Sequence, residues 1–321
     1  MQKLTFTDYE AYSGAVGDAD LLMMLPRMRQ PRWEISTLPV RGVHIQYGRE
    51  GCGNLVEGAG RDGATVLFLP VAGFHRANGS PLDDRSVLVI EPRREFSIAV
   101  QEPHNWYSVS VPHSAVGEEP SEGEGRTGLG SRVLTPGADS VARIRTLLSQ
   151  VVEAAQVEPS VLSAHAAVAR IEAELVAACL PVFAAAPIRL DPVGRAVIPR
   201  EHIIRSSIGL VERCPDFTLG VYDMAEAADV SVRTLRKAFL EYFGVPPLRY
   251  LTTRRLHEAR RALRAADPEA TTVTAVATRF GFWQFGRFAA DYRRLFGEYP
   301  SETLKANRRP RSQPKVIEVL G

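Results

Sequence analysis

Residues 221–244 read VYDMAEAADVSVRTLRKAFLEYFG, and this stretch predicts two short helices joined by a tight turn. Apolar residues in the first helix recur at i, i+3, i+4 and i+7, which places them on one helix face. They are Val221, Met224, Ala225 and Ala228. The second helix repeats this pattern with Leu235, Ala238, Phe239 and Tyr242. We expect Ser231 to cap that second helix and Gly244 to end it.

The exposed face of the second helix is basic near its N-terminal end. Arginine and lysine donate hydrogen bonds to guanine or to phosphates, and a helix fits the major groove of DNA. The residues predicted to contact bases from this helix are Ser231, Arg233, Thr234, Arg236 and Lys237. A solvated basic face on an ordinary helical hairpin explains the same residues equally well, because charge runs are usually solvent faces.

A second copy of the pattern favours DNA contact over a solvated basic face. Residues 274–282 predict another short helix and turn, and a further helix follows from Gln284 to the glycine at 297. Leu235 and Phe288 are 53 residues apart, as are Gly244 and Gly297. Before the turn, matching residues such as Ala225 and Ala277 are 52 residues apart, so the second turn has one extra residue. Two helix-turn-helix units in register indicate a duplicated module.

A helix is predicted from Pro247 to about Ala266, between the two units. A helix of roughly 20 residues is about 30 Å long, close to the separation of about 34 Å between successive major-groove faces. This rod could hold two recognition helices on one side of a duplex. Its outer face is expected to contact phosphates through arginines at 254, 255, 260, 261 and 264.

Three sets of residues define a longer motif. The first unit contributes Ala225, Ala228, Val230, Ser231, Leu235, Phe239, Gly244 and Pro247. The rod contributes Arg254, Arg255, Leu256, Ala259 and Leu263. The second unit contributes Ala277, Gly281, Phe282, Phe288, Tyr292, Gly297, Pro300 and Ser301. Together they resemble the AraC/XylS family of bacterial transcriptional regulators over roughly the last third of the chain, although the family usually has Phe where Tyr292 stands.

The resemblance implies which side chains read DNA. Positions matching Arg233, Arg236 and Lys237 read bases in related proteins. In the second unit Gly286 and Ala290 offer no donor, so Gln284 and Arg287 are the expected base contacts there. The expected phosphate contacts are Arg254, Arg255, Arg293 and Arg294. The second unit would therefore mainly position the protein.

Composition and charge agree with a DNA-binding part joined to another domain. The chain has 321 residues and a formal net charge of +2. Residues 195–321 contain 22 Lys and Arg against 14 Asp and Glu, whereas residues 1–194 contain 17 against 23. Neither an apolar membrane span nor a signal peptide is predicted. Three unclustered cysteines (Cys52, Cys179 and Cys214) indicate buried free thiols and a cytoplasmic protein.

Residues 1–135 predict an all-β domain. Short runs of strand-forming residues near 43–47, 65–69, 87–90, 96–100 and 106–111 alternate with turn clusters. The family resemblance adds the expectation of a cupin-like barrel that binds an effector. We expect no metal site, because His75, His104 and His113 lack the His-x-His spacing of cupin metal sites. Aromatic residues could line a pocket, although core packing is the more common role; they are Trp33, Phe74, Trp106 and Tyr107.

Helices and linkers complete the predicted organisation. Two helices are expected in residues 136–186, spanning Ser140–Ala155 and Pro159 to about Val182, where they either pack within the domain or form a dimer interface. We place a mobile loop at 117–132, the interdomain linker at 187–200, and the DNA-binding domain at 201–306, beginning with a helix at Ile203–Val211. The basic tail at 307–321 would add non-specific attraction to DNA.

The predicted fold class is therefore α+β, and the predicted function is sequence-specific, effector-responsive transcriptional regulation without catalysis or cofactors. The predicted partners are double-stranded DNA and a second copy of the chain, with RNA polymerase and a small-molecule effector as further candidates. Two alternatives remain. One is a DNA-alkyl repair enzyme with a reactive cysteine such as Cys52. The other is a ligand-binding protein whose helical part contacts proteins and does not read DNA.

Overall fold

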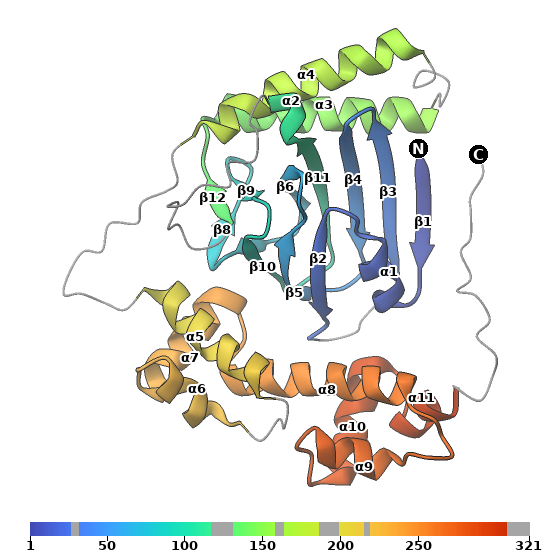
Figure 1. The fold of residues 1–321 in the computed structure, drawn as a ribbon, viewed down its shortest axis with the longest axis vertical. Coiled ribbons are helices and arrows are strands. Elements are labelled where there is room, and N and C mark those ends of the chain that lie inside the picture. The colour runs from blue at the N-terminus through green and yellow to red at the C-terminus, as the bar shows by residue number, and fades with distance from the viewer. Residues whose placement is uncertain (27–31, 117–130, 158–163, 186–198, 215–218, 307–321) are drawn as a thin grey trace.

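The computed structural model describes residues 1–26, 32–116, 131–157, 164–185, 199–214 and 219–306. A β-rich N-terminal part lies against a helical C-terminal part, which confirms the predicted α+β class (Figure 1). The predicted tail lies outside the described residues, as do most of the predicted linker at 187–200 and most of the predicted loop at 117–132.

Twelve strands of the described residues form two antiparallel sheets. The seven-stranded sheet has the order β1 (Gln2–Phe6), β3 (Trp33–Val40), β4 (Val43–Glu50), β11 (His104–Pro112), β6 (Ala64–Ala72), β9 (Val87–Ile90) and β12 (Arg132–Leu134). The five-stranded sheet has the order β2 (Ala19–Met24), β5 (Asn54–Gly60), β10 (Glu95–Val100), β7 (His75–Ala77) and β8 (Ser80–Leu82). The predicted β-rich character of this part is confirmed, and cupin-like closure stays a prediction. Two short helices, α1 (Tyr9–Ala15) and α2 (His113–Val116), were not predicted.

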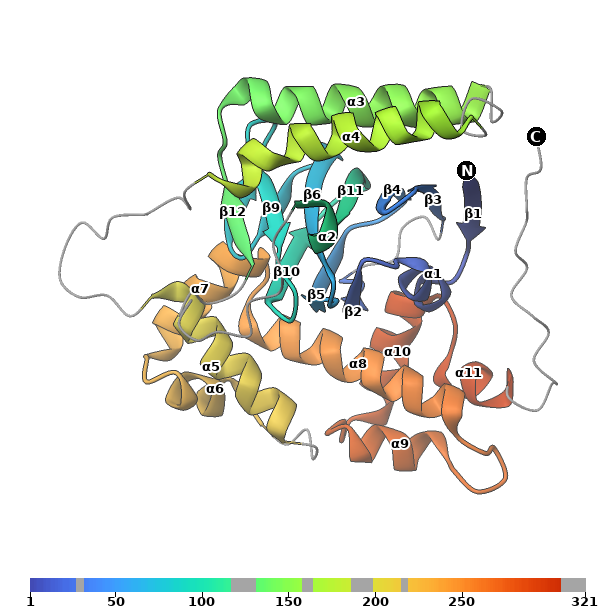
Figure 2. The ribbon, with the colours of Figure 1, turned by 45° about the horizontal axis from the view of Figure 1, so that its top comes forward.

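Two long helices cover the outer face of the seven-stranded sheet (Figure 2). Helix α3 spans Ala138–Val157, and its buried stripe packs on sheet residues such as Ile45 and Val109. Helix α4 spans His165–Phe183, so it begins later than the predicted start at Pro159, which lies outside the described residues. Packing within the chain therefore accounts for the apolar stripes, and a dimer interface on these helices stays a proposal.

The C-terminal part contains both predicted helix pairs. Helix α5 (Arg200–Arg213) supports the first unit, α6 (Val221–Ala227) with α7 (Val232–Phe243). The rod is α8 (Pro247–Ala265). The second unit is α9 (Val273–Arg279) with α10 (Phe285–Phe296), followed by α11 (Pro300–Ala306). Units one and two lie at opposite ends of α8 (Figures 1 and 2).

The turns of the two units repeat at the level of single hydrogen bonds. The N–H of Val230 donates to the carbonyl of Ala225, and the N–H of Phe282 donates to that of Ala277. A positive φ lies just before each donor, 51° at Asp229 and 76° at Gly281. Both second helices end on a left-handed glycine, with φ 70° at Gly244 and 76° at Gly297, as predicted.

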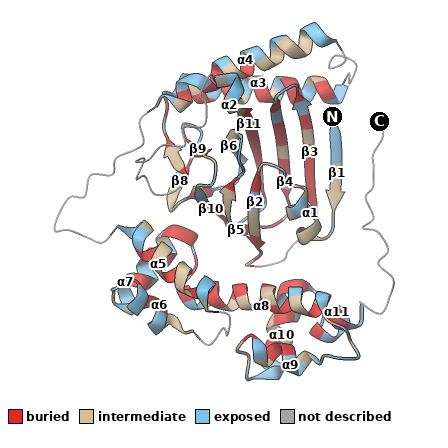
Figure 3. Ribbon diagram, viewed as in Figure 1, coloured by how far each residue is buried: buried red, intermediate tan, exposed pale blue. Residues whose placement is uncertain are grey.

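Apolar side chains of the β part and the helical part share buried clusters. Tyr9 stacks on Phe296 with ring centroids 6.5 Å apart, and Met24 lies in one cluster with Phe239. Figure 3 shows buried residues along the strands and again on α8 and the helices at its two ends. One side of the helical part is thus covered, and only its other surfaces are open to a partner.

Candidate nucleic-acid interface

Helix α7, the helix predicted to contact bases in the first unit, begins with a capped turn. The hydroxyl of Ser231 accepts a hydrogen bond from the backbone N–H of Thr234 at 3.1 Å, which confirms the predicted N-cap. The two hydroxyls are also 2.9 Å apart. The cap therefore occupies both hydroxyls in the free protein, and a base contact by either stays a prediction.

Three cationic side chains stand exposed beyond this cap. Arg233, Arg236 and Lys237 point away from the face that buries Leu235 and Phe239. The only ion pair that any of the three makes among the described residues is a long one, from Lys237 Nζ to Glu241 at 4.0 Å. These side chains are free to donate to phosphates or base edges.

Helix α10, the corresponding helix of the second unit, offers fewer donors. Gln284 is its N-cap residue but makes no capping hydrogen bond with its side chain. The side chain of Arg287 is 77 % exposed and lies 3.7 Å from Asp291 on the next turn. Asp291 also pairs with Arg294, so this face is less positive than that of α7. The arrangement agrees with a positioning role for the second unit.

One exposed aromatic residue was missed by sequence reasoning. The duplicated turn residues Val230 and Phe282 are 52 apart, whereas the N-cap residues Ser231 and Gln284 are 53 apart. The extra residue of the second turn is therefore Trp283. Its side chain is 72 % exposed, directly before the N-cap residue of α10. The change of offset, read together with an aromatic residue in a turn, was the signal available in the sequence.

The predicted phosphate contacts divide into exposed and occupied residues. Arg293 and Arg294 are exposed on α10, and Arg293 lies 4.5 Å over the ring of Tyr299. Arg255 is half-buried and donates to the carbonyl of Leu219, which ties α8 to the segment before α6. Burial lowers the pKa of Arg255. Among these residues, Arg293 and Arg294 are the more available to DNA.

The prediction of an outward-facing Arg254 is wrong for this structure. Arg254 is 9 % exposed and lies 3.4 Å from Glu57 of the β part and 3.6 Å from Glu212. Tyr250 donates to the same Glu57 at 2.7 Å. Periodicity placed Arg254 on a charged face of α8, but that face meets acidic residues of the β part. The buried position of Arg254 therefore does not support its predicted contact with phosphate.

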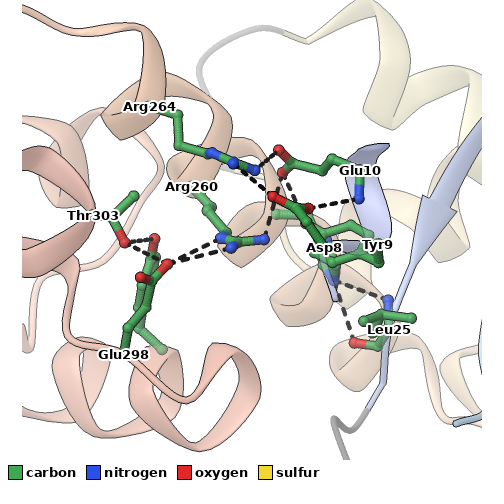
Figure 4. A network of polar contacts seen from close by, with 10 residues as sticks. Asp8, Tyr9, Glu10, Leu25, Arg260, Arg264, Glu298 and Thr303 are labelled. Atoms are coloured by element: carbon green, nitrogen blue, oxygen red, sulfur yellow. Dashed lines mark hydrogen bonds and ion pairs between the residues drawn. The ribbon is translucent and has the colours of Figure 1, made fainter. Parts of the chain in front are cut away.

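The same face of α8 carries a second set of ion pairs, drawn in Figure 4. Arg264 pairs with Asp8 at 2.6 Å and also with Glu10. Arg260, which is 8 % exposed, lies between Glu10 at 3.8 Å and Glu298 at 3.3 Å. The N-terminal residues of the chain therefore hold the arginines that the sequence suggested for phosphates. Arg261 is exposed and pairs with Glu258 at 2.9 Å.

A groove of about 1010 Å³ opens between α8 and α10. Leu248 and Thr252 line it from α8, and Arg287 and Arg294 line it from α10. Pro26, which follows β2, forms part of its rim. The polar face of α10 thus shares a groove with the rod, next to the β part.

The β part has a cavity of its own between the two sheets. Trp106 lines this cavity, so of the two predicted roles, pocket lining and core packing, it has the first. Trp33 and Tyr107 are core residues, and Phe74 is 59 % exposed.

His75 and His104 are buried, and no group of three or more His, Cys, Asp or Glu side chains in the described ranges is arranged to hold a metal ion. Within those ranges no helix has the length and apolar character needed to cross a membrane.

These features define the class of the C-terminal part, a double helix-turn-helix domain. Residues 224–306 match a family described as a helix-turn-helix domain. Over 103 residues the chain is 39 % identical to the probable thc operon regulatory protein of Rhodococcus erythropolis, covering 32 % of this chain and 31 % of that protein. Over 82 residues it is 38 % identical to the XylDLEGF operon transcriptional activator of Pseudomonas putida, covering 26 % of each.

The C-terminal part is therefore an AraC-type helix-turn-helix domain, and the predicted resemblance to AraC/XylS regulators is confirmed there. The chain spans about a third or less of the length of these two curated relatives. Among solved structures, the AraC-like transcriptional activator CuxR aligns with 80 % of this chain and 92 % of its own, at 14 % identity and a TM-score of 0.41.

Proposed function

We propose that this protein is a sequence-specific DNA-binding regulator of transcription. Helix α7 would enter one major groove and present Arg233, Arg236 and Lys237 to bases, while α10 would enter the next groove with Gln284 and Arg287. The observation that carries this proposal is a duplicated helix-turn-helix with exposed cations on α7. The named relatives of this domain are operon regulators and activators.

The length of α8 supports placement in successive grooves. It has 19 residues, which corresponds to about 28 Å at 1.5 Å per residue. Major-groove faces on one side of B-DNA recur about every 34 Å, and the reading helices lie at the two ends of the rod. We propose Arg293 and Arg294 as phosphate contacts, with Arg255 contributing only if its bond to Leu219 opens.

A titration with DNA tests this proposal. The full-length protein would be mixed with a random-sequence DNA pool, and the bound fraction would be enriched and sequenced. We expect two short conserved blocks about one helical turn apart, and an affinity that falls with salt at a slope of about −0.9 per phosphate contact. A protein whose helical part contacts only other proteins would enrich no sequence and would show no such slope.

The repair-enzyme alternative has no support from its cysteine. Cys52 is 1 % exposed, and burial, together with the charge of Glu50, raises the pKa of its thiol to about 12. A reactive cysteine needs a lowered pKa and access to its substrate. The relatives of the domain are regulators, in agreement with a function that does not involve catalysis.

The rest of the proposal concerns regulation. The β part would sense a small molecule in the cavity between its sheets, and α3 with α4 would supply a surface for a second copy of the chain. Such a regulator would act in the cytoplasm, where bacterial DNA and RNA polymerase are found. Gel filtration with light scattering would test the dimer.

A further inference from the structure

The cavity between the two sheets has mostly apolar walls. About 50 Å³ of it is open to the centre of a water molecule, enough for roughly four waters or a ligand of similar size. Apolar side chains from both sheets line it, among them Met23, Val56, Phe68, Ile98 and Trp106. A ligand held there must therefore be small and carry an apolar body.

The charged and hydrogen-bonding side chains of the wall are concentrated on few positions. His104, Trp106 and Ser108 alternate along β11, so they point to the same side of the sheet. Asp18, Glu50 and Asn54 complete the set, and no Lys or Arg is among the described residues that line the cavity. A carboxylate or phosphate ligand would meet two acidic side chains and no cation of the Lys or Arg type.

Carboxylates of the wall already use most of its side-chain donors. Trp106 Nε1 donates to Glu50 Oε1 at 2.9 Å, and Asn54 Nδ2 donates to Glu50 Oε2 at 2.7 Å. The hydroxyl of Ser108 donates to Asp18. Trp106 and Ser108 therefore have no donor left for a ligand, and Asn54 keeps one of its two amide hydrogens.

His104 is also occupied on both ring nitrogens. Its Nδ1 lies 3.1 Å from the carbonyl of Glu102, and its Nε2 lies 3.5 Å from Glu50 Oε1. Both neighbours are acceptors, so whichever ring nitrogen carries a hydrogen has an acceptor of the protein beside it. The ring therefore offers no free donor to an anionic ligand.

Acceptors, by contrast, remain unused. Asn54 Oδ1 is buried and has no hydrogen-bond partner among the described residues. The amide cannot simply turn over, because its nitrogen must face the Glu50 carboxylate. Glu50 Oε2 accepts a bond only from Asn54 within that part of the chain, although a carboxylate oxygen has room for two. Burial by itself would raise the pKa of Glu50. His104, Trp106 and Tyr12 together lower it by more, so the pKa lies below its usual value and the side chain is ionised.

We propose that the effector of the β part is a small primary amine with an apolar body, whose ammonium group donates to Asn54 Oδ1 and to the Glu50 carboxylate. This inference rests on the proposed sensing function of the β part. An ammonium group supplies three donors and one positive charge, which matches the two open acceptors and the excess of acidic side chains. The apolar body would replace water against the aliphatic wall.

Calorimetric titration of the full-length protein without DNA tests the inference. The ligands are n-butylamine, its matched acid butyrate and its matched alcohol 1-butanol, all at pH 7.5. We expect saturable binding of n-butylamine, weaker binding of 1-butanol, and an affinity for butyrate at least tenfold below that of the amine. Absence of amine binding, or butyrate binding as tightly as the amine, would overturn the proposal. DNA affinity measured without ligand is independent, so either proposal can fail alone.

Variants locate the binding in this cavity. Asn54→Ala removes the unpaired acceptor, and Glu50→Gln removes the charge while keeping the shape. Each should weaken n-butylamine binding at least tenfold in protein that circular dichroism shows to be folded. Asp20→Asn is the matched control, because that carboxylate lies on β2 with its side chain 80 % exposed and outside the cavity. Unchanged amine binding in folded Asn54→Ala would show that the amine does not bind in this cavity. An equal loss of amine affinity in Asp20→Asn would show the same, and either result would overturn the proposal.

Discussion

His257 on α8 accepts a hydrogen bond from the backbone N–H of Leu25, with 3.0 Å between Leu25 N and His257 Nε2. Its other nitrogen, Nδ1, lies 2.8 Å from the hydroxyl of Tyr9, which in turn donates to Glu10 at 3.0 Å. A neutral imidazole with its proton on Nδ1 satisfies all three groups. Burial lowers the pKa of His257 to about 3, so the β part and the rod are joined through an uncharged histidine.

This contact predicts a loss of stability in mild acid. The pKa of His257 is about 3 in the folded protein, against 6.5 for an ordinary histidine, so the unfolded chain binds a proton first as the pH falls. The stabilisation is complete above pH 6.5 and declines below it, by about 2 kcal/mol at pH 5. Urea denaturation at pH 7.5, 6 and 5 would measure this slope.

Two variants separate His257 from the other titrating groups. His257→Gln should make the decline between pH 6.5 and 5 shallower, because no proton can be taken up at that position in the unfolded chain, while buried His75, whose pKa is lowered to about 4, still contributes. His202→Gln is the matched control, since His202 is exposed on α5. An unchanged slope in His257→Gln would show that another group causes the pH dependence.

Arg254→Ala should reduce stability more than it changes DNA binding. Removal of the guanidinium leaves Glu57, a carboxylate of the β part, without its cation in a buried place. Breaking a buried ion pair in this way typically costs about 3–5 kcal/mol. Thermal denaturation would measure the loss, with Arg261→Ala as the control, because Arg261 makes an exposed pair worth about 1 kcal/mol or less. Equal stability of the two variants would refute the structural role.

The helical part could be predicted closely from the sequence because its signals are local. Spacing of apolar residues, the cap at Ser231 and the glycine at 244 each act within a few residues of where they occur. The site was predicted less completely. Whether Arg254 or Arg236 faces solvent depends on what covers each helix, and the acidic partner Glu57 lies almost 200 residues earlier in the chain. Helical periodicity gives a charged face but does not say whether solvent, DNA or another domain meets it.

In the β part, too, features that depend on distant segments could not be predicted from the sequence. Strands β4, β6, β9, β10 and β11 had clear runs of strand-forming residues, whereas β7 and β8 are three residues each and depend on neighbours for their pairing. The cavity depends on Glu50, Asn54 and Ser108, which come from three strands. Their meeting is a result of sheet order and has no signature in a single segment.

Arg236→Ala should weaken specific DNA binding by roughly 1–3 kcal/mol and relax the sequence preference at one position. The reason is that Arg236 is exposed on α7 and its guanidinium has no ion pair among the described residues, so its donors are available for a base edge. Fluorescence anisotropy with the enriched site and with single-base variants would measure both effects. Arg293→Ala is the matched comparison, expected to weaken all sequences alike. A retained sequence preference in Arg236→Ala would mean that α7 is not the reading helix.

Trp283→Ala should weaken binding to the half of the site that α10 occupies, by about 1 kcal/mol or roughly fivefold. The indole is 72 % exposed beside the N-cap residue Gln284, where burial of about 40–50 Å² of apolar surface against DNA contributes energy of this size. Contact with thymine methyl groups would make the loss larger at A·T pairs. Stability should be unchanged, because the side chain is mostly in solvent. Phe74→Ala, an aromatic residue that is 59 % exposed on the β part, is the control, and an equal loss of DNA affinity there would assign the effect to general surface change.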